Sequence, residues 1–273
     1  MDATDGLSVI KLGVADANAG LALSTEAHWN QTEEDWLVFL RDGVVFGIRE
    51  GARLVATAAL LPYSDNNAWI SMVLVSATHR RRGLATRLVD ACLEAARKNG
   101  LTSWLDATPD GAAVYGRLGF TPTLQLRRLK LMKPTPASAE APSAATLEAL
   151  CARDQRATGF DRTALLTALA QRAGSRIVAA NSSIALVRDG RTARHIGPMF
   201  ADHAVEALAL VRVIAGSENG PLLLDAVASQ PAFLDGLTAS GWTIERPFQR
   251  MRFGPPTAAA EETPFAVAGP EFG

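Results

Sequence analysis

A short arginine-rich loop between an apolar run and a helix is the part of this sequence best suited to chemistry. The run W-I-S-M-V-L-V (Trp69–Val75) has the composition of a β-strand, and H-R-R-R-G (His79–Gly83) follows it closely. From Gly83 to Lys98 apolar residues recur at helical spacing, and Gly100 marks the stop. A helix N-terminus presents free N–H groups and the positive end of the helix dipole. The pattern therefore predicts an anion site, for which a diphosphate is a natural ligand.

The loop differs from two common phosphate-binding patterns. No G-K-[ST] follows its glycine, as a Walker loop would require, and it holds only one of the glycines of a dinucleotide fingerprint. Gly83 has no Cβ and lets a ligand approach the backbone, and Ala85 keeps the first helical turn shallow. From these residues alone an alternative stays open, in which Arg80–Arg82 form only a solvated basic turn.

Composition limits what else the protein could be. The chain has 273 residues, 48% apolar residues and a formal net charge of −1. These values exclude wholesale disorder and argue against a general nucleic-acid or acidic-membrane binder. The only cysteines, Cys92 and Cys151, exclude a disulfide framework, and the four histidines lack metal-ligand spacing. Cys92 falls on the apolar stripe of its helix and is predicted to be core. We expect a soluble, cytoplasmic protein that has no membrane span and no metal.

Element signals along the chain predict an α/β (α+β) fold with a mixed sheet. Helical spacing occurs at 16–23, 33–40, 83–98 and 111–118, and strand composition at 7–12, 44–49, 53–61, 68–75, 101–106 and 119–131. The first half closes with a strand, a helix and a strand. The same order is predicted again near the end of the chain, at 222–226, 231–240 and 241–253.

An internal repeat relates the two halves of the chain. Asp106 aligns with Asp225, and after a short insertion Phe120 aligns with Trp242 and Arg128 with Arg250. The alternative is that one β-α-β unit simply resembles another. We predict two copies of one fold, at 1–132 and 146–253. A Pro/Ala-rich linker at 133–145 joins them, and a loosely held tail at 254–273 follows.

Two motifs resemble the GNAT superfamily of N-acetyltransferases. V-S-A-T-H-R-R-R-G-L-A (Val75–Ala85) is similar to the family's strand–loop–helix signature, with Ala77 and Ala85 in place of a usual proline and a second glycine. Y-G-R-L-G-F (Tyr115–Phe120) resembles the family's second patch. Together with H-W-N-Q-T-E-E-D-W (His28–Trp36), they resemble a subgroup with two tandem GNAT-like domains. The resemblance implies a GNAT-like acyl-CoA N-acyltransferase fold in two copies, the second one degenerate.

The resemblance also implies roles for individual residues. Tyr115 would hydrogen-bond the leaving sulfur, and the alternative is a tyrosine that only packs beneath the last strand. Candidate bases are Asp106, Glu26, Glu33, Glu34 and Asp35, each of which could instead be a solvated charge or a cap. Trp29 and Asn30 would line the substrate wall. The residues implied for the coenzyme are Val73, Leu74, Val75, Arg80, Arg81, Arg82, Gly83, Leu84, Ala85 and Thr86.

The function implied is an acetyl-CoA-dependent N-acetyltransferase that acts on a primary amine by direct transfer in a ternary complex. Acetyl-CoA would be the acyl donor, and the acceptor a small-molecule or protein amine. The alternative is a non-catalytic acyl-CoA-binding sensor or interaction module, and a homodimer is one open possibility. In the second copy, R-H-I-G-P-M-F (Arg194–Phe200) runs into A-D-H-A with no arginine–glycine loop, and Leu237 stands opposite Tyr115. That copy is predicted to hold no coenzyme.

Overall fold

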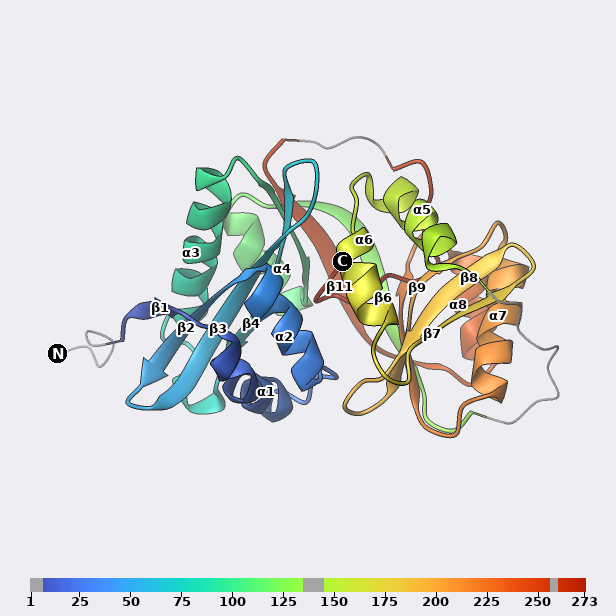
Figure 1. Cartoon of the computed structure of the whole chain (residues 1–273), viewed down its shortest axis with the longest axis horizontal. Coiled ribbons are helices and arrows are strands. Elements are labelled where there is room, and N and C mark those ends of the chain that lie inside the picture. Colours follow the sequence, from blue (N-terminus) through green and yellow to red (C-terminus); the bar gives the residue numbers. More distant parts are fainter. Residues whose placement is uncertain (1–6, 135–144, 256–259) are drawn as a thin grey trace. The chain divides into compact units, whose positions relative to one another are not determined.

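The computed structural model describes residues 7–134, 145–255 and 260–273 (Figure 1). Most of the predicted linker, 133–145, lies outside the described residues. The chain divides into two compact units, residues 1–105 and 106–273. Within the described part, no helix is long and apolar enough to cross a bilayer.

The described residues of the first unit form five paired strands and three α-helices. Two of the helices come before β2 in the chain, and the third connects β4 to β5. Strands β1 to β4 are antiparallel, and β5 pairs with β4 in parallel, in the order β1-β2-β3-β4-β5. The elements are β1 (Val9–Lys11), α1 (Ala17–Glu26), α2 (Glu33–Asp42), β2 (Val44–Glu50), β3 (Arg53–Pro62), β4 (Asn67–Val75), α3 (Leu84–Lys98) and β5 (Thr102–Ala107), with short 3₁₀ turns η1 (Val14–Asp16) and η2 (Ala77–His79).

Local sequence explains the two helices that matter most for the site. At the start of α2 the hydroxyl of Thr32 accepts from the Asp35 amide, and the Asp35 carboxylate accepts from the Thr32 amide at 2.8 Å. This capping box engages the Asp35 carboxylate. In α3 the apolar stripe is buried, Cys92 with it, and burial raises the pKa of the Cys92 thiol. The prediction that Cys92 is core is confirmed.

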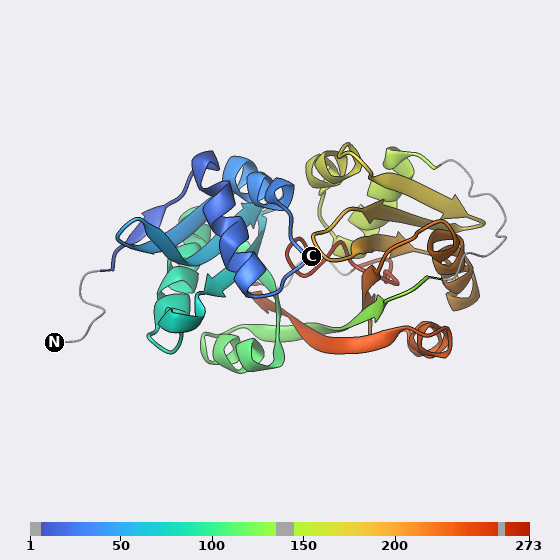
Figure 2. The same cartoon turned by 90° about the horizontal axis from the view of Figure 1, so that it is seen from below.

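The strands of the second unit pair in the order β11-β6-β10-β9-β8-β7, with both parallel and antiparallel neighbours. β6 lies between β10 and β11 and is antiparallel to both; Figure 2 shows β6 and β11 side by side. The elements are α4 (Pro109–Arg117), β6 (Thr121–Leu131), α5 (Leu147–Thr158), α6 (Thr163–Ala170), β7 (Arg176–Ala180), β8 (Ser183–Arg188), β9 (Arg194–Phe200), α7 (Ala204–Gly216), β10 (Leu222–Val227), α8 (Pro231–Ala239) and β11 (Thr243–Phe253).

The element order repeats along the chain, as the internal repeat predicts. Two helices, three antiparallel strands, a helix, a strand, a helix and a strand occur first from α1 to β6 and again from α5 to β11. The predicted mixed α/β fold in two copies is confirmed. The division into compact units falls within β5, so α4 and β6 belong with the second unit by their contacts, although they close the first copy in sequence.

Two buried ion pairs connect residues that the repeat aligns. Asp225 on β10 pairs with Arg128 on β6 through two hydrogen bonds of 2.8 Å. Asp106 at the end of β5 pairs with Arg250 on β11 at 2.9 and 2.8 Å. Each aspartate therefore binds the arginine of the other copy. This pattern follows from the position of β6 between β10 and β11.

The expectation of a loosely held tail is wrong for residues 265–273. Phe265, Val267 and Phe272 are at most 3% exposed. Arg162 donates to the carbonyl oxygens of Phe272 and Gly273 at 2.8 and 2.6 Å, and Arg188 pairs with Glu271 at 2.8 Å. The proline, alanine and glycine content suggested a free segment, but the apolar side chains and buried ion pairs fix it in the second unit.

Candidate functional site

The predicted anion loop is a turn that leads directly into α3. β4 ends at Val75, η2 spans Ala77–His79, and α3 starts at Leu84. The buried His79 ring shapes this turn, because its Nδ1 lies 2.8 Å from the Ser76 hydroxyl and 2.9 Å from that of Thr78. These contacts give the ring a structural role.

Gly83 is the N-cap of α3 and has left-handed backbone torsions, φ 73° and ψ 3°. A Cβ built on it would meet nothing within 4 Å, so the space beside this glycine is open. The Arg87 amide donates to the Gly83 carbonyl at 3.1 Å and so closes the first turn of the helix. The amides of Leu84, Ala85 and Thr86 precede this bond and therefore have no intrahelical acceptor.

Three consecutive arginines give the loop positive charge. Arg80, Arg81 and Arg82 are all exposed, and Arg81 adopts a left-handed φ of 61°. Exposed guanidinium groups beside unpaired helix amides favour a doubly charged anion such as a diphosphate. The sequence resemblance implies that this site holds the diphosphate of coenzyme A.

Before the loop, β4 contains a bulge that separates two pairing regions. It pairs with β5 from Asn67–Thr102 to Trp69–Trp104, and its register with β3 shifts between Thr57 and Ala59. Met72 lies at the shift with φ 52°, and its carbonyl accepts from the Thr57 hydroxyl at 2.8 Å. A bulge redirects a strand. The bulge leads into Val73, Leu74 and Val75, which the resemblance implies would pair with the pantetheine arm and acetyl group of the coenzyme, together its acyl arm.

Glu26, at the end of α1, reaches the same loop. Its carboxylate accepts from the Ala77 amide at 2.6 Å and lies 3.6 Å from the Arg53 guanidinium, with 35% of its side chain exposed. The structure therefore brings Glu26 to the start of the anion loop. Sequence spacing gave no signal of this contact, because 51 residues separate the two partners.

The substrate-wall candidates follow α1. Trp29 is half-buried and Asn30 is 8% exposed. The neighbouring Gln31 belongs to the same motif but is not among the predicted site residues. It is 4% exposed, and its Oε1 has no hydrogen-bond partner in the described part of the chain. Glu33, Glu34 and Asp35 occupy the first turn of α2, where acidic residues favour the helix dipole.

Tyr115 and Asp106 belong to the second compact unit. Tyr115, on α4, is half-buried, and its ring meets that of Phe120 edge to face at 5.6 Å. The Asp106 carboxylate is fully buried in its pair with Arg250; burial raises the pKa of Asp106, and the guanidinium opposes that shift. This environment explains Asp106 as a structural residue, so its predicted catalytic role gains no support from the geometry.

In the described part of the chain, no group of three or more histidine, cysteine, aspartate or glutamate side chains could hold a metal ion. The site consists of backbone amides, arginines and a carboxylate.

Family comparisons agree with this geometry. Residues 16–120 match the model of the acetyltransferase (GNAT) family, and residues 150–266 match that of an acetyltransferase (GNAT) domain. An N-acetyltransferase of Bacillus subtilis (strain 168), YitH, described as uncharacterized, is 25% identical over 254 residues, which are 89% of each chain.

Solved structures share the fold along the whole chain. A structure described as that of an acetyltransferase from Pyrococcus horikoshii covers 98% of this chain and 96% of its own, with a TM-score of 0.81 and 21% identity. A tandem GNAT protein from the clavulanic acid biosynthesis pathway covers 92% and 99%, with a TM-score of 0.65 and 17% identity. The chain therefore belongs to the GNAT acetyltransferase family and carries two GNAT domains in tandem.

We expect Gly83→Glu to weaken acetyl-CoA binding by at least about tenfold, or 1.4 kcal/mol. The added carboxylate would enter the open space beside the loop and repel a diphosphate. Gly100→Glu is a matched control: Gly100 also has a positive φ, 65°, and open space, but it follows the other end of α3. Titration calorimetry on both variants measures the effect, and equal affinities for Gly83→Glu and wild type would contradict it.

Proposed function

We propose that this protein transfers the acetyl group of acetyl-CoA to a primary amine by direct attack in a ternary complex. The observation that carries the proposal is the anion loop, in which Gly83, exposed arginines and unpaired α3 amides surround open space. Family membership supports an acyltransferase. The acceptor is a small-molecule or protein amine.

In this proposal the chain provides binding and orientation. Arg80–Arg82 and the first α3 amides hold the diphosphate, and β4 beyond its bulge lies along the acyl arm. Direct transfer then requires an uncharged amine. An alkylammonium of pKa near 10.4 is deprotonated in only about one molecule in a thousand at pH 7. A proton acceptor must therefore lie on the substrate side, next to the residues that orient the amine, Trp29 and Asn30.

Among the candidate bases, Glu26 is better placed than Asp106. It is partly exposed and touches the anion loop, whereas Asp106 is buried in an ion pair. A carboxylate that accepts a proton from the amine, directly or through water, contributes about 10²–10⁴-fold in rate. In the same proposal the Tyr115 hydroxyl donates a hydrogen bond to the departing thiolate.

The test is turnover of acetyl-CoA against a panel of amines, with released thiol as the readout. We expect amine-dependent release in the wild type and its loss in Gly83→Glu at subsaturating acetyl-CoA. Binding of acetyl-CoA without turnover for any small or peptide amine would favour the acyl-CoA sensor instead. Failure to bind acetyl-CoA would reject both functions.

We expect Glu26→Gln to lower kcat by about 10²-fold or more. Acetyl-CoA affinity should stay within about threefold, because the amide oxygen of glutamine still accepts from the Ala77 N–H. Glu34→Gln neutralises another of the candidate bases, in the exposed first turn of α2, and is expected to keep kcat, so the pair of variants distinguishes the two carboxylates. If kcat of Glu26→Gln were unchanged, the role of Glu26 would be limited to positioning the loop.

A further inference from the structure

In the second unit, a segment of the chain lies between two parallel strands where they separate. β9 and β10 pair from Arg194–Leu222 to Ile196–Leu224. Beyond that point Met199 exchanges backbone hydrogen bonds with the final segment: its amide donates to the Ala266 carbonyl at 2.8 Å, and its carbonyl accepts from the Phe265 amide at 2.9 Å. This edge of β9 therefore pairs with residues 265 and 266.

The other edge of the segment pairs with β10. The Val227 amide donates to the Phe265 carbonyl, and the Val267 amide donates to the Asp225 carbonyl, both at 3.1 Å. Residues 265–267 thus act as an inserted strand, with antiparallel bridges from Ala266 to Met199 and to Ala226. They satisfy backbone groups that the separation of β9 and β10 would leave unpaired.

The same strand arrangement occurs in the first unit. β4 and β5 are the counterparts of β9 and β10 in the repeated element order, and their parallel pairing also spans three residue pairs, ending at Trp69–Trp104. The register shift of β3 against β4 has its equivalent between β8 and β9, at Ala185/Val187. The inserted segment therefore occupies the place that corresponds to the predicted acyl-arm site of the first unit.

We propose that residues 261–268 are a built-in ligand of the second GNAT domain, filling its acyl-coenzyme cleft from the diphosphate end to the acyl arm. That this cleft corresponds to a coenzyme site rests on the proposed function. That the chain itself occupies the cleft does not depend on that function. One consequence is that each chain binds a single acetyl-CoA.

Close packing leaves no room for a second occupant between β9 and β10. A Cβ on Gly197 of β9 would lie 2.0 Å from the Val267 carbonyl oxygen, so the segment approaches the strand as closely as glycine allows. Ala266 and Ala268 are fully buried, and Phe265 packs edge to face on Phe233 of α8 at 5.2 Å. A pantetheine arm could enter only if these contacts were broken.

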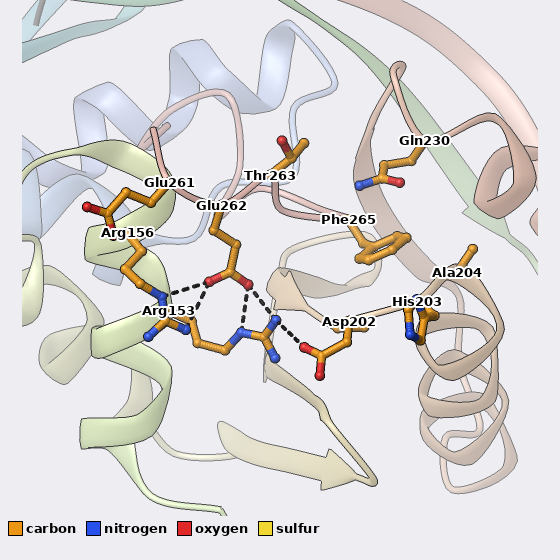
Figure 3. A pocket seen from close by; sticks show the side chains of 11 residues that line it. Arg153, Arg156, Asp202, His203, Ala204, Gln230, Glu261, Glu262, Thr263 and Phe265 are labelled. Atoms are coloured by element: carbon orange, nitrogen blue, oxygen red, sulfur yellow. Dashed lines mark hydrogen bonds and ion pairs between the residues drawn. The ribbon is translucent and has the colours of Figure 1, made fainter. Parts of the chain in front are cut away.

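At the other end of the cleft, the Glu262 carboxylate lies at the position that corresponds to the predicted diphosphate site of the first unit. A cavity of about 640 Å³ lies at the start of α7, the counterpart of α3, and Figure 3 shows Glu262 between two arginines there. Glu262 Oε1 lies 2.6 Å from Arg153 Nε, and its Oε2 lies 3.1 Å from an Arg156 terminal nitrogen. Asp202, also on Arg153 at 3.0 Å, adds a second acid. The arginines are already neutralised by the chain's own carboxylates.

Hydrogen exchange on the full-length chain tests the proposal. Without ligand, we expect peptides that cover 196–200, 222–228 and 264–268 to exchange at least about 100-fold more slowly than an unfolded chain. Saturating acetyl-CoA should leave them unchanged while it slows exchange at 80–86. Rapid exchange at 264–268, or new protection in β9 and β10 with acetyl-CoA, would overturn the built-in ligand. Lack of any change at 80–86 would instead count against the proposed function.

A matched pair of glycine variants tests the contact itself. Gly197→Ala should collide with the Val267 carbonyl, so we expect exchange at 264–268 to rise at least about tenfold, with a lower melting temperature. Gly220→Ala, in open space before β10, should change neither. If Gly197→Ala left the protection at 264–268 intact, the proposal would fail. If that variant did not fold, the wild-type exchange pattern would still decide the question.

Discussion

Replacement of Tyr115 by phenylalanine is expected to lower kcat by about 10²–10⁴-fold, with KM for acetyl-CoA within about twofold of wild type. The change removes one hydroxyl and keeps the ring that meets Phe120 at 5.6 Å, so α4 and its contacts should survive. A tyrosine of pKa near 10 is a weaker acid than a thiol near 8.5, and full proton transfer to the thiolate is uphill by about 2 kcal/mol. A hydrogen bond formed as charge develops on sulfur is sufficient.

Steady-state kinetics with saturating amine measure this effect, and thermal melting confirms that the fold is intact. The chain offers a natural control, since Tyr63, which follows β3, is its only other tyrosine. Tyr63→Phe should keep kcat. If Tyr115→Phe also kept kcat where the chemical step limits the rate, Tyr115 would be a packing residue.

Removal of the Arg128 side chain charge is expected to have the largest effect on stability. Arg128→Met should lower the free energy of unfolding by about 3–5 kcal/mol, because it leaves the fully buried Asp225 carboxylate without its bidentate partner. His195 Nε2 remains 3.1 Å from Asp225, but burial lowers the pKa of His195 and favours its neutral form.

The loss of unfolding free energy in Arg128→Met should become smaller as the pH falls. The Arg128 guanidinium and the hydrogen bond from His195 hold the pKa of Asp225 below its usual range, against the opposing effect of burial. The folded state therefore gains stability from this carboxylate above the unfolded pKa of about 3.9 and loses it as the pH falls further. In Arg128→Met burial should raise the pKa, so the difference from wild type should shrink toward acidic pH.

Denaturant unfolding between neutral and acidic pH measures the difference. Arg127→Met, on the same strand, is the control, because the Arg127 guanidinium bonds a backbone carbonyl and an amide side chain. A loss below about 1 kcal/mol for Arg128→Met at neutral pH would contradict the assigned role. Adding Asp225→Asn to Arg128→Met should recover part of the loss, since it removes the unpaired charge.

Local patterns in the sequence were sufficient to predict the anion loop and the element order. Strand composition up to Val75, a glycine at the N-cap and apolar spacing in α3 all act over a few residues, and Gly83 has the left-handed torsions that glycine adopts at low cost. The alignment of Asp106 with Asp225 and of Arg128 with Arg250 was also visible. These signals determine where elements begin and which faces they bury, and therefore which fold is built.

Only the tertiary structure decided which of the aligned partners pair. Each aspartate had two equivalent arginines available, and the insertion of β6 between β10 and β11 joined Asp225 to Arg128 and Asp106 to Arg250. The contact of Glu26 with Ala77 and the burial of residues 265–268 likewise join segments far apart in the chain. Such contacts depend on strand order and on backbone groups left unpaired between separating strands, and neither is encoded in the periodicity of a single segment.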